Sequence, residues 1–128
     1  MRPAEILAIC TMSLATLGSA DLVQAAGMDG NGLLSNCQRA LRAFGEGDTS
    51  ARSLEAGICL GYAAGYRDAL DYQKLYTPIE ICIPDAATNG QIMRVLVKFL
   101  EENPEQLHQN AGALAFAALK IAYACTDQ

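Results

Sequence analysis

The 128-residue sequence contains a single histidine, His108, and no two cysteines separated by only two to four residues. A histidine metal site needs a second imidazole, and structural zinc sites usually take their cysteines in close pairs. Basic residues are also few, nine against fourteen acidic ones, and they do not form the cluster that nucleic-acid binding requires. We therefore expect no metal ion, no other cofactor and no nucleic-acid partner.

The sequence also lacks the residue patterns of common catalytic sites. His108 is expected at the start of a helix, on the surface, and no base stands beside any of the candidate serines in the sequence. The pair Glu101 and Glu102 fits a solvated helix end better than acid–base catalysis, and no glycine-rich phosphate loop follows a strand. The sequence indicates a binding protein rather than an enzyme. The three candidate nucleophilic serines without a neighbouring base are Ser35, Ser50 and Ser53.

No apolar run reaches the roughly 20 residues that span a bilayer. The apolar stretch from Ile6 to Leu17 follows a short charged start and precedes small residues, which is typical of a secretory signal peptide. We predict cleavage after Ala25, with Ala20 as the alternative site and a retained membrane anchor as the less favoured reading. Residues 26–128 would then form one exported domain with a net charge of −4 and no membrane contact.

Apolar residues recur at helical spacing in four segments, and no segment has the pattern of a strand. The first helix is expected over 33–44, with Gly45 as a left-handed cap. The second is expected from about Arg52 to Leu70 or slightly beyond, with its N-cap among residues 48–50. Pro78 then begins the interruption that makes the next segment a long irregular connection.

The third helix is expected to begin at Thr88, because Thr88 and Gln91 match a capping box. The fourth is expected to open directly after Asn103 and Pro104, since proline is well tolerated in the first helical turn. The predicted fold is therefore all-α: a compact bundle of four main helices, arranged as two antiparallel hairpins.

Five cysteines are present, and Cys10 would leave with the signal peptide. The remaining four in an exported chain indicate two disulfides. Cys37 and Cys59 lie at similar distances from the first turn, and Cys82 and Cys125 lie at similar distances from the second. On antiparallel helices each pair would stand at a similar height, so we predict these two pairings out of three connectivities.

Within GICLGYAAGYRDAL, glycine stands at every fourth position, at Gly57, Gly61 and Gly65. Each glycine inside a helix costs roughly 1 kcal/mol relative to alanine, so this face requires an explanation. At about 100° per residue, Cys59 points away from it, toward the first helix. We expect the glycine face to pack against the small residues of the fourth helix, with self-association of two copies as the alternative.

Three motifs are similar to those of the Rap/Tai immunity proteins, which accompany amidase effectors of type VI secretion. They are C-x-G-Y-x-x-G at 59–65, Cys-Ile-Pro at 82–84 and Pro-Glu-x-Leu-His at 104–108, and the resemblance covers residues 57–125. Members often carry proline before the last cysteine, where this chain has Ala124. The resemblance implies a small helical periplasmic protein, commonly a homodimer, that binds a peptidoglycan-cleaving amidase and occludes its catalytic cleft.

Two segments are candidates for partner binding. The favoured one is the proline-interrupted connection, because it can protrude and carries tyrosines of the kind enriched at interfaces. The other is the turn between the third and fourth helices, and a connection that is only a solvated linker is a further reading. A helical periplasmic chaperone-like protein without a toxin partner is the alternative function. The residues are Tyr72, Tyr76, Glu80 and Asp85 in the connection, and Glu101, Glu102 and Glu105 in the turn.

Overall fold

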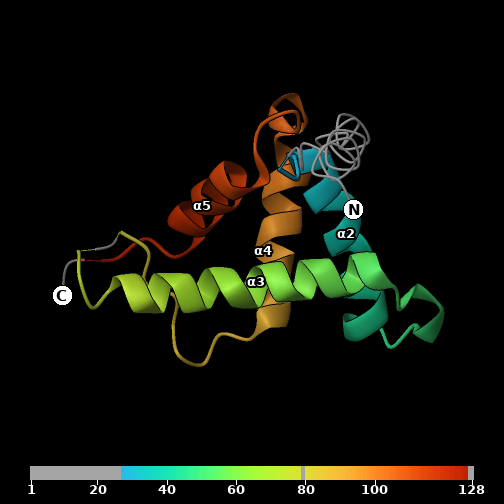
Figure 1. Cartoon of the computed structure of the whole chain (residues 1–128), viewed down its shortest axis with the longest axis horizontal. Coiled ribbons are helices and arrows are strands. Elements are labelled where there is room, and N and C mark those ends of the chain that lie inside the picture. The colour runs from blue at the N-terminus through green and yellow to red at the C-terminus, as the bar shows by residue number, and fades with distance from the viewer. Residues whose placement is uncertain (1–26, 79, 127–128) are drawn as a thin grey trace, which may run out of the picture.

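Four α-helices make up most of the computed structural model, which describes residues 27–78 and 80–126 (Figure 1). The predicted signal peptide and its cleavage sites lie outside these residues. Within the described ranges there are no strands, only two isolated bridges, and the all-α prediction is confirmed. The helices are α2 (Gly30–Ala40), α3 (Leu54–Gln73), α4 (Asn89–Glu102) and α5 (Ala111–Ala122), with a π-helical turn at Leu41–Gly45 and 3-10 turns at Thr49–Ala51 and Pro104–Gln106.

The long helix α3 lies across α4 in Figure 1, with α2 and α5 on different sides of the crossing. The helix α2 packs against both α3 and α4, whereas α5 packs mainly against α4. Together the four helices bury one apolar core, and no polar or charged residue among those described is buried. Its largest fully buried side chains are Leu33, Ile81, Ile92, Leu96, Leu100 and Leu119.

The helix starts follow local capping chemistry. The predicted capping box at α4 is confirmed: Thr88 Oγ1 accepts from the Gln91 N–H at 3.2 Å, and the Thr88 N–H donates to Gln91 Oε1 at 2.7 Å. The start of α3 differs from the expectation. Asp48 caps the short 3-10 turn, and the hydroxyl of Ser53 caps α3 by accepting from the Ala56 N–H at 3.3 Å.

Two predicted helix boundaries are wrong, namely the C-terminal cap of the first helix and the start of the fourth. The first helix does stop at Gly45, but through a π-helical turn, and the left-handed backbone lies at Gly47, with φ of 74°. The fourth helix does not open at Pro104. There the chain makes a 3-10 turn, and α5 begins seven residues later because Asn110 supplies a cap that accepts from two backbone N–H groups. A proline with φ near −65° fits either helical form, which explains the error.

The two disulfides have the predicted pairing, Cys37–Cys59 and Cys82–Cys125. The first is fully buried and joins α2 to the core-facing side of α3. The second joins two segments outside the helices, one before α4 and one after α5. Among the described helices, none combines the length and the apolar character needed to cross a bilayer.

Candidate functional site

Three large side chains form an exposed cluster at the C-terminal end of α3, which we call the aromatic corner: Tyr72, Leu75 and Tyr76. Their exposed fractions are 64%, 74% and 69%. The two tyrosine rings lie 5.0 Å apart between centroids, and a hydrogen bond with Tyr72 raises the pKa of Tyr76 above its usual 10.0. Tyrosine side chains are among those enriched at interface hot spots, so Tyr72 and Tyr76 are candidate anchors for a partner.

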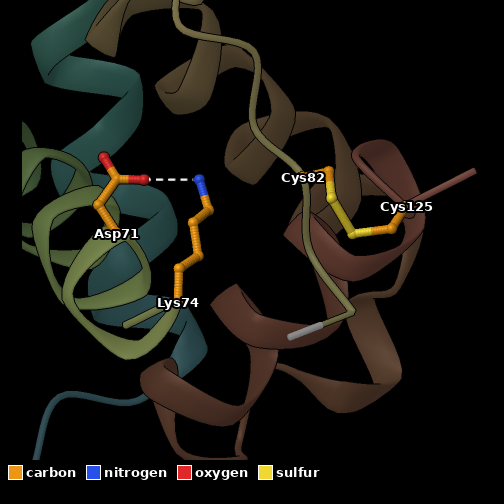
Figure 2. The surroundings of a disulfide bond; sticks show 4 residues. All are labelled: Asp71, Lys74, Cys82 and Cys125. Carbon is orange, nitrogen blue, oxygen red and sulfur yellow. Dashed lines mark hydrogen bonds and ion pairs between the residues drawn. A yellow bond between two sulfur atoms is a disulfide. The ribbon is translucent and has the colours of Figure 1, made fainter. Parts of the chain in front are cut away.

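The aromatic corner is more helical than the sequence suggested. Tyr72 lies in the last turn of α3, and Tyr76 in the turn that follows, so the irregular connection begins only after them. The same turn carries an exposed ion pair, with Lys74 Nζ 2.7 Å from Asp71 Oδ1 (Figure 2). The two tyrosines are therefore presented on a regular, capped helix end rather than on a loose loop.

The second half of the connection is attached to the C-terminal segment. Ile81 and Ile83 point into the core, with 1% and 7% exposure. Cys82 lies between these two isoleucines, and its N–H donates to the Tyr123 carbonyl at 2.7 Å. A second backbone hydrogen bond joins the same two segments, from the Cys125 N–H to the Glu80 carbonyl at 3.3 Å. The disulfide closes the same contact covalently (Figure 2). The connection is thus anchored at the three consecutive residues 81–83, by two buried side chains and one disulfide.

The acidic groups of the connection differ in their surroundings. The Glu80 carboxylate forms an ion pair with Lys120 of α5, across the disulfide-linked segments. Asp85 is exposed, and among the described residues its side chain has no hydrogen-bond or ion-pair partner. Asp85 is therefore the acid of the connection whose charge is available to a partner.

The acids of the α4–α5 turn are exposed but already engaged. Glu101 accepts from Gln38 Nε2 at 2.8 Å, Glu102 lies 3.9 Å from Lys98 Nζ, and Glu105 accepts from Gln106 at 3.3 Å. The turn itself is held by the start of α2, since backbone N–H groups at 30 and 31 donate to carbonyls at 109 and 107. It lies at the opposite end of α4 from the connection (Figure 1).

The predicted packing of the glycine face within the chain is wrong. Gly57, Gly61 and Gly65 are exposed, and a Cβ built on any of them meets no atom within 4 Å. The small residues of α5 do face the core, but α5 lies against α4 rather than over these glycines. The cysteine side of α3 faces α2 as expected. The glycine face is thus open to solvent.

An open apolar groove of about 410 Å³ overlaps the glycine face, with Gly61 and Gly65 in its lining. Its aromatic lining residues are Tyr62 and Tyr66 from α3 and Phe116 from α5. The Tyr66 hydroxyl donates to the Gly112 carbonyl at 2.7 Å, and burial raises the pKa of Tyr66 above its usual 10.0. A smaller hollow of about 220 Å³ shares Phe116 and leads to the connection at Glu80 and Ile81.

Nothing in the described residues assembles into a recognisable catalytic or metal centre. No group of three or more histidine, cysteine or acidic side chains there is suitable for holding a metal ion. His108 is exposed near the α4–α5 turn, and Ser53 serves as a helix cap. The molecular surface instead presents contact features, namely the aromatic corner, the acidic connection and the open groove.

Sequence reasoning missed two of the exposed apolar residues that contribute to these surfaces. Leu75 completes the aromatic corner, and Phe116 is 42% exposed at the edge of the groove. Phe116 does stand one position off the alanine stripe of α5, so its outward direction follows from the helical period. Leu75 had no such signal, because the helical turn around it was not expected.

A family model described as Rap1a immunity proteins matches residues 29–125, which is most of the chain. The matched region contains all four helices and both disulfides. A search of curated proteins and a search of solved structures found no significant match.

Proposed function

Because the chain belongs to the Rap1a immunity protein family, we propose that it protects its cell from a peptidoglycan-cleaving amidase delivered by type VI secretion. It would act in the periplasm, by binding the amidase and covering its active site. Family membership supports an immunity protein for a secreted effector. An inhibitor of this kind acts by contact, without catalysis, and the exposed surfaces described above suit that role.

One observation carries the proposal: the exposed tyrosines of the aromatic corner accompany the exposed carboxylate of Asp85, which is unpaired among the described residues. That carboxylate belongs to a connection that a disulfide and backbone hydrogen bonds hold in place. Peptidoglycan is anionic, so an enzyme that grips it needs basic groups around its cleft, and acidic groups on an inhibitor raise the association rate. Asp85 and the aromatic corner provide the two components. Because the disulfide and the backbone contacts already order the connection, less entropy is lost on binding.

Export to the periplasm is supported by the disulfides and by the chemistry of the target. Disulfides form and persist in oxidising compartments such as the bacterial periplasm, and both pairs have bonding geometry. A wall-degrading enzyme injected by a neighbouring cell acts outside the inner membrane. Its inhibitor must therefore be exported to meet it, which the predicted signal peptide would achieve.

We also propose that two copies associate through the glycine face. The three glycines leave open space beside the α3 backbone, and Leu54 and Ile58 on the same helix are 78% and 40% exposed. Small residues allow two helices to approach closely and gain dispersion contacts. A homodimer built this way would also cover part of the apolar groove.

Two alternatives remain for the experiments to exclude. The turn that carries Glu101, Glu102 and Glu105 is a second candidate for the effector contact, because these residues are exposed. A chaperone-like envelope protein without a toxin partner is the second candidate function. The open apolar groove favours it, since such a groove suits an apolar segment of an unfolded client.

The test is inhibition of the cognate type VI amidase, to be sought among the genes next to the one for this chain and by affinity capture, and measured as release of cleaved peptide from purified peptidoglycan. Wild type should inhibit at a one-to-one ratio. Tyr76→Ala and Asp85→Lys should weaken inhibition about tenfold or more, as expected for anchor residues, while Glu101→Lys serves as the matched charge change on the turn. Full inhibition by the first two variants with loss in Glu101→Lys would assign the contact to the turn. No binding to the amidase by wild type would favour the chaperone-like alternative.

A further inference from the structure

Arg67 of α3 holds the last part of the connection by its main chain. Its Nη2 donates to the carbonyls of Asp85 at 2.9 Å and Pro84 at 3.3 Å, and its Nη1 donates to the carbonyl of Ala87. One side chain thus grips three carbonyls within four consecutive residues. A planar guanidinium with a fixed fork of donors suits this task, and hydrogen bonds from a charged donor are stronger than neutral ones.

We call the three hydrogen bonds from Arg67 to the carbonyls of Pro84, Asp85 and Ala87 the clamp. It holds a segment that makes few other hydrogen bonds to the rest of the chain. The segment up to residue 82 is held by the disulfide and by backbone contacts with the C-terminal segment, and Thr88 already caps α4. Between them, the only backbone–backbone hydrogen bond among the described residues is local, from the Ala87 N–H to the Pro84 carbonyl at 2.9 Å. Arg67 forms no ion pair there, so its charge is directed at these carbonyls.

We propose that Arg67 is a positioning residue for partner binding. It fixes the main chain at 84–87 in the path that presents the Asp85 carboxylate to the effector, without contacting the effector itself. This role rests on the proposed immunity function. Without the clamp only a fraction of molecules hold Asp85 in the competent position, and the apparent affinity falls by that fraction.

The choice of acceptors has a consequence for specificity. Because Arg67 binds main-chain oxygens, replacing the side chains at 85, 86 and 87 leaves the clamp intact. The exposed Asp85 and Ala86 side chains are therefore free to differ between proteins that face different effectors. The segment combines a fixed backbone path with replaceable contact groups, which is the arrangement that partner selection requires.

The first measurement needs no partner: hydrogen exchange of the whole exported chain, compared between wild type, Arg67→Met, Arg67→Lys and the control Arg52→Met. Arg52 is an exposed arginine that, among the described residues, makes no side-chain hydrogen bond or ion pair. Arg67→Met should speed exchange of the Ala87 amide about tenfold or more, with the protection of α4 beyond Ile92 unchanged. Arg67→Lys, which keeps one charged donor, should fall between.

The second measurement uses the same cognate amidase, with its nucleophile replaced by alanine, and records association and dissociation rates. Arg67→Met should lower the association rate about fivefold or more with little change in dissociation, because competent molecules are fewer but their contacts are the same. Arg67→Lys should recover part of the loss. Combining Arg67→Met with Asp85→Ala should cost less than the product of the two single effects, since the first acts through the second.

Three outcomes would overturn the proposal. Unchanged exchange of the Ala87 amide would show that Arg67 does not order the segment. Faster exchange with unchanged association would show a purely structural clamp. Faster dissociation with unchanged association would make Arg67 a direct contact. If wild type itself fails to bind the amidase, the immunity function fails with that partner, and any role of Arg67 in binding it fails too, whatever the exchange shows.

Discussion

Replacing Gly61 with alanine should stabilise the protein, although Gly61 belongs to a repeated motif. An added Cβ meets no atom within 4 Å, and the residue lies in the middle of the 20-residue helix α3. Alanine is favoured over glycine in a helix interior by about 1 kcal/mol, and with nothing to clash against, most of this gain should appear. For a domain of this size the melting temperature should rise by about 4 °C or more.

Gly30 provides the matched comparison, because it is a helical glycine with no free space. A Cβ there would lie 2.9 Å from both the Cα and the carbonyl oxygen of Leu107 and 2.5 Å from Leu114 Cδ1. The backbone of Leu107 cannot move away easily, since its carbonyl accepts hydrogen bonds from Asn31. Gly30→Ala should therefore destabilise the protein by about 1 to 3 kcal/mol through overpacking.

Both variants are compared by thermal unfolding followed by circular dichroism at several protein concentrations, because a dimer makes the melting temperature depend on concentration. A melting temperature of Gly61→Ala below that of wild type, under conditions where both are monomers, would contradict the expected stabilisation, because some part of the chain must then cover the glycine. The variant Gly61→Leu tests whether the glycine face forms the homodimer. It should fold as a monomer with near-normal stability, and light scattering should show that the homodimer is lost.

Three further predictions concern the anchors and caps. Replacing Cys82 and Cys125 together by alanine should cost about 4 kcal/mol by the loop-entropy model for a separation of 43 residues, and calorimetry checks this. Thr88→Ala should cost about 1 kcal/mol in denaturant unfolding, and a smaller effect in Thr88→Ser would locate the cause in the hydroxyl. A hydrogen bond from the Gly32 N–H lowers the pKa of Asp29 below its usual 3.8, so its stabilisation holds above that pH and is lost as pH falls through the lowered value. Acid titration of Asp29→Asn, which still caps, should show a shallower loss.

Local signals in the sequence accounted for most of the helices, the α4 cap and the first disulfide. The helical period and the Thr88 and Gln91 pair are each written within a few residues, and Cys37 and Cys59 do face each other from two helices. The Cys82–Cys125 pairing was right for another reason than the one predicted, because both cysteines lie outside the helices. The start of α5 was not predictable in this way. Pro104 suits the first turn of either helix type, and the choice was made by tertiary contacts that tie residues 107 and 109 to the start of α2.

The candidate site was predictable only in part. The sequence predicted that Tyr72 and Tyr76 are exposed, and both are, although Tyr72 lies within α3. The period of the glycines could not show whether protein or solvent would lie against them. Arg67 gave no signal at all. Its partners are backbone carbonyls 17 to 20 residues away. Every residue has a backbone carbonyl, so no residue type in the sequence indicates which ones accept from Arg67.

The helix α3 carries three separate tasks on three sides of its circumference. At about 100° per residue, Arg67 points roughly 80° from the buried Cys59 and roughly 120° from the open glycine face around Gly61, which itself lies roughly 160° from Cys59. One side joins the core through a disulfide, one orders the connection, and one is free for a second copy. Because the last two sides share no contact, Gly61→Leu and Asp85→Lys should act independently, the first on dimerisation and the second on effector binding. A double variant whose binding loss exceeds the single Asp85→Lys loss would show that the dimer itself completes the effector site.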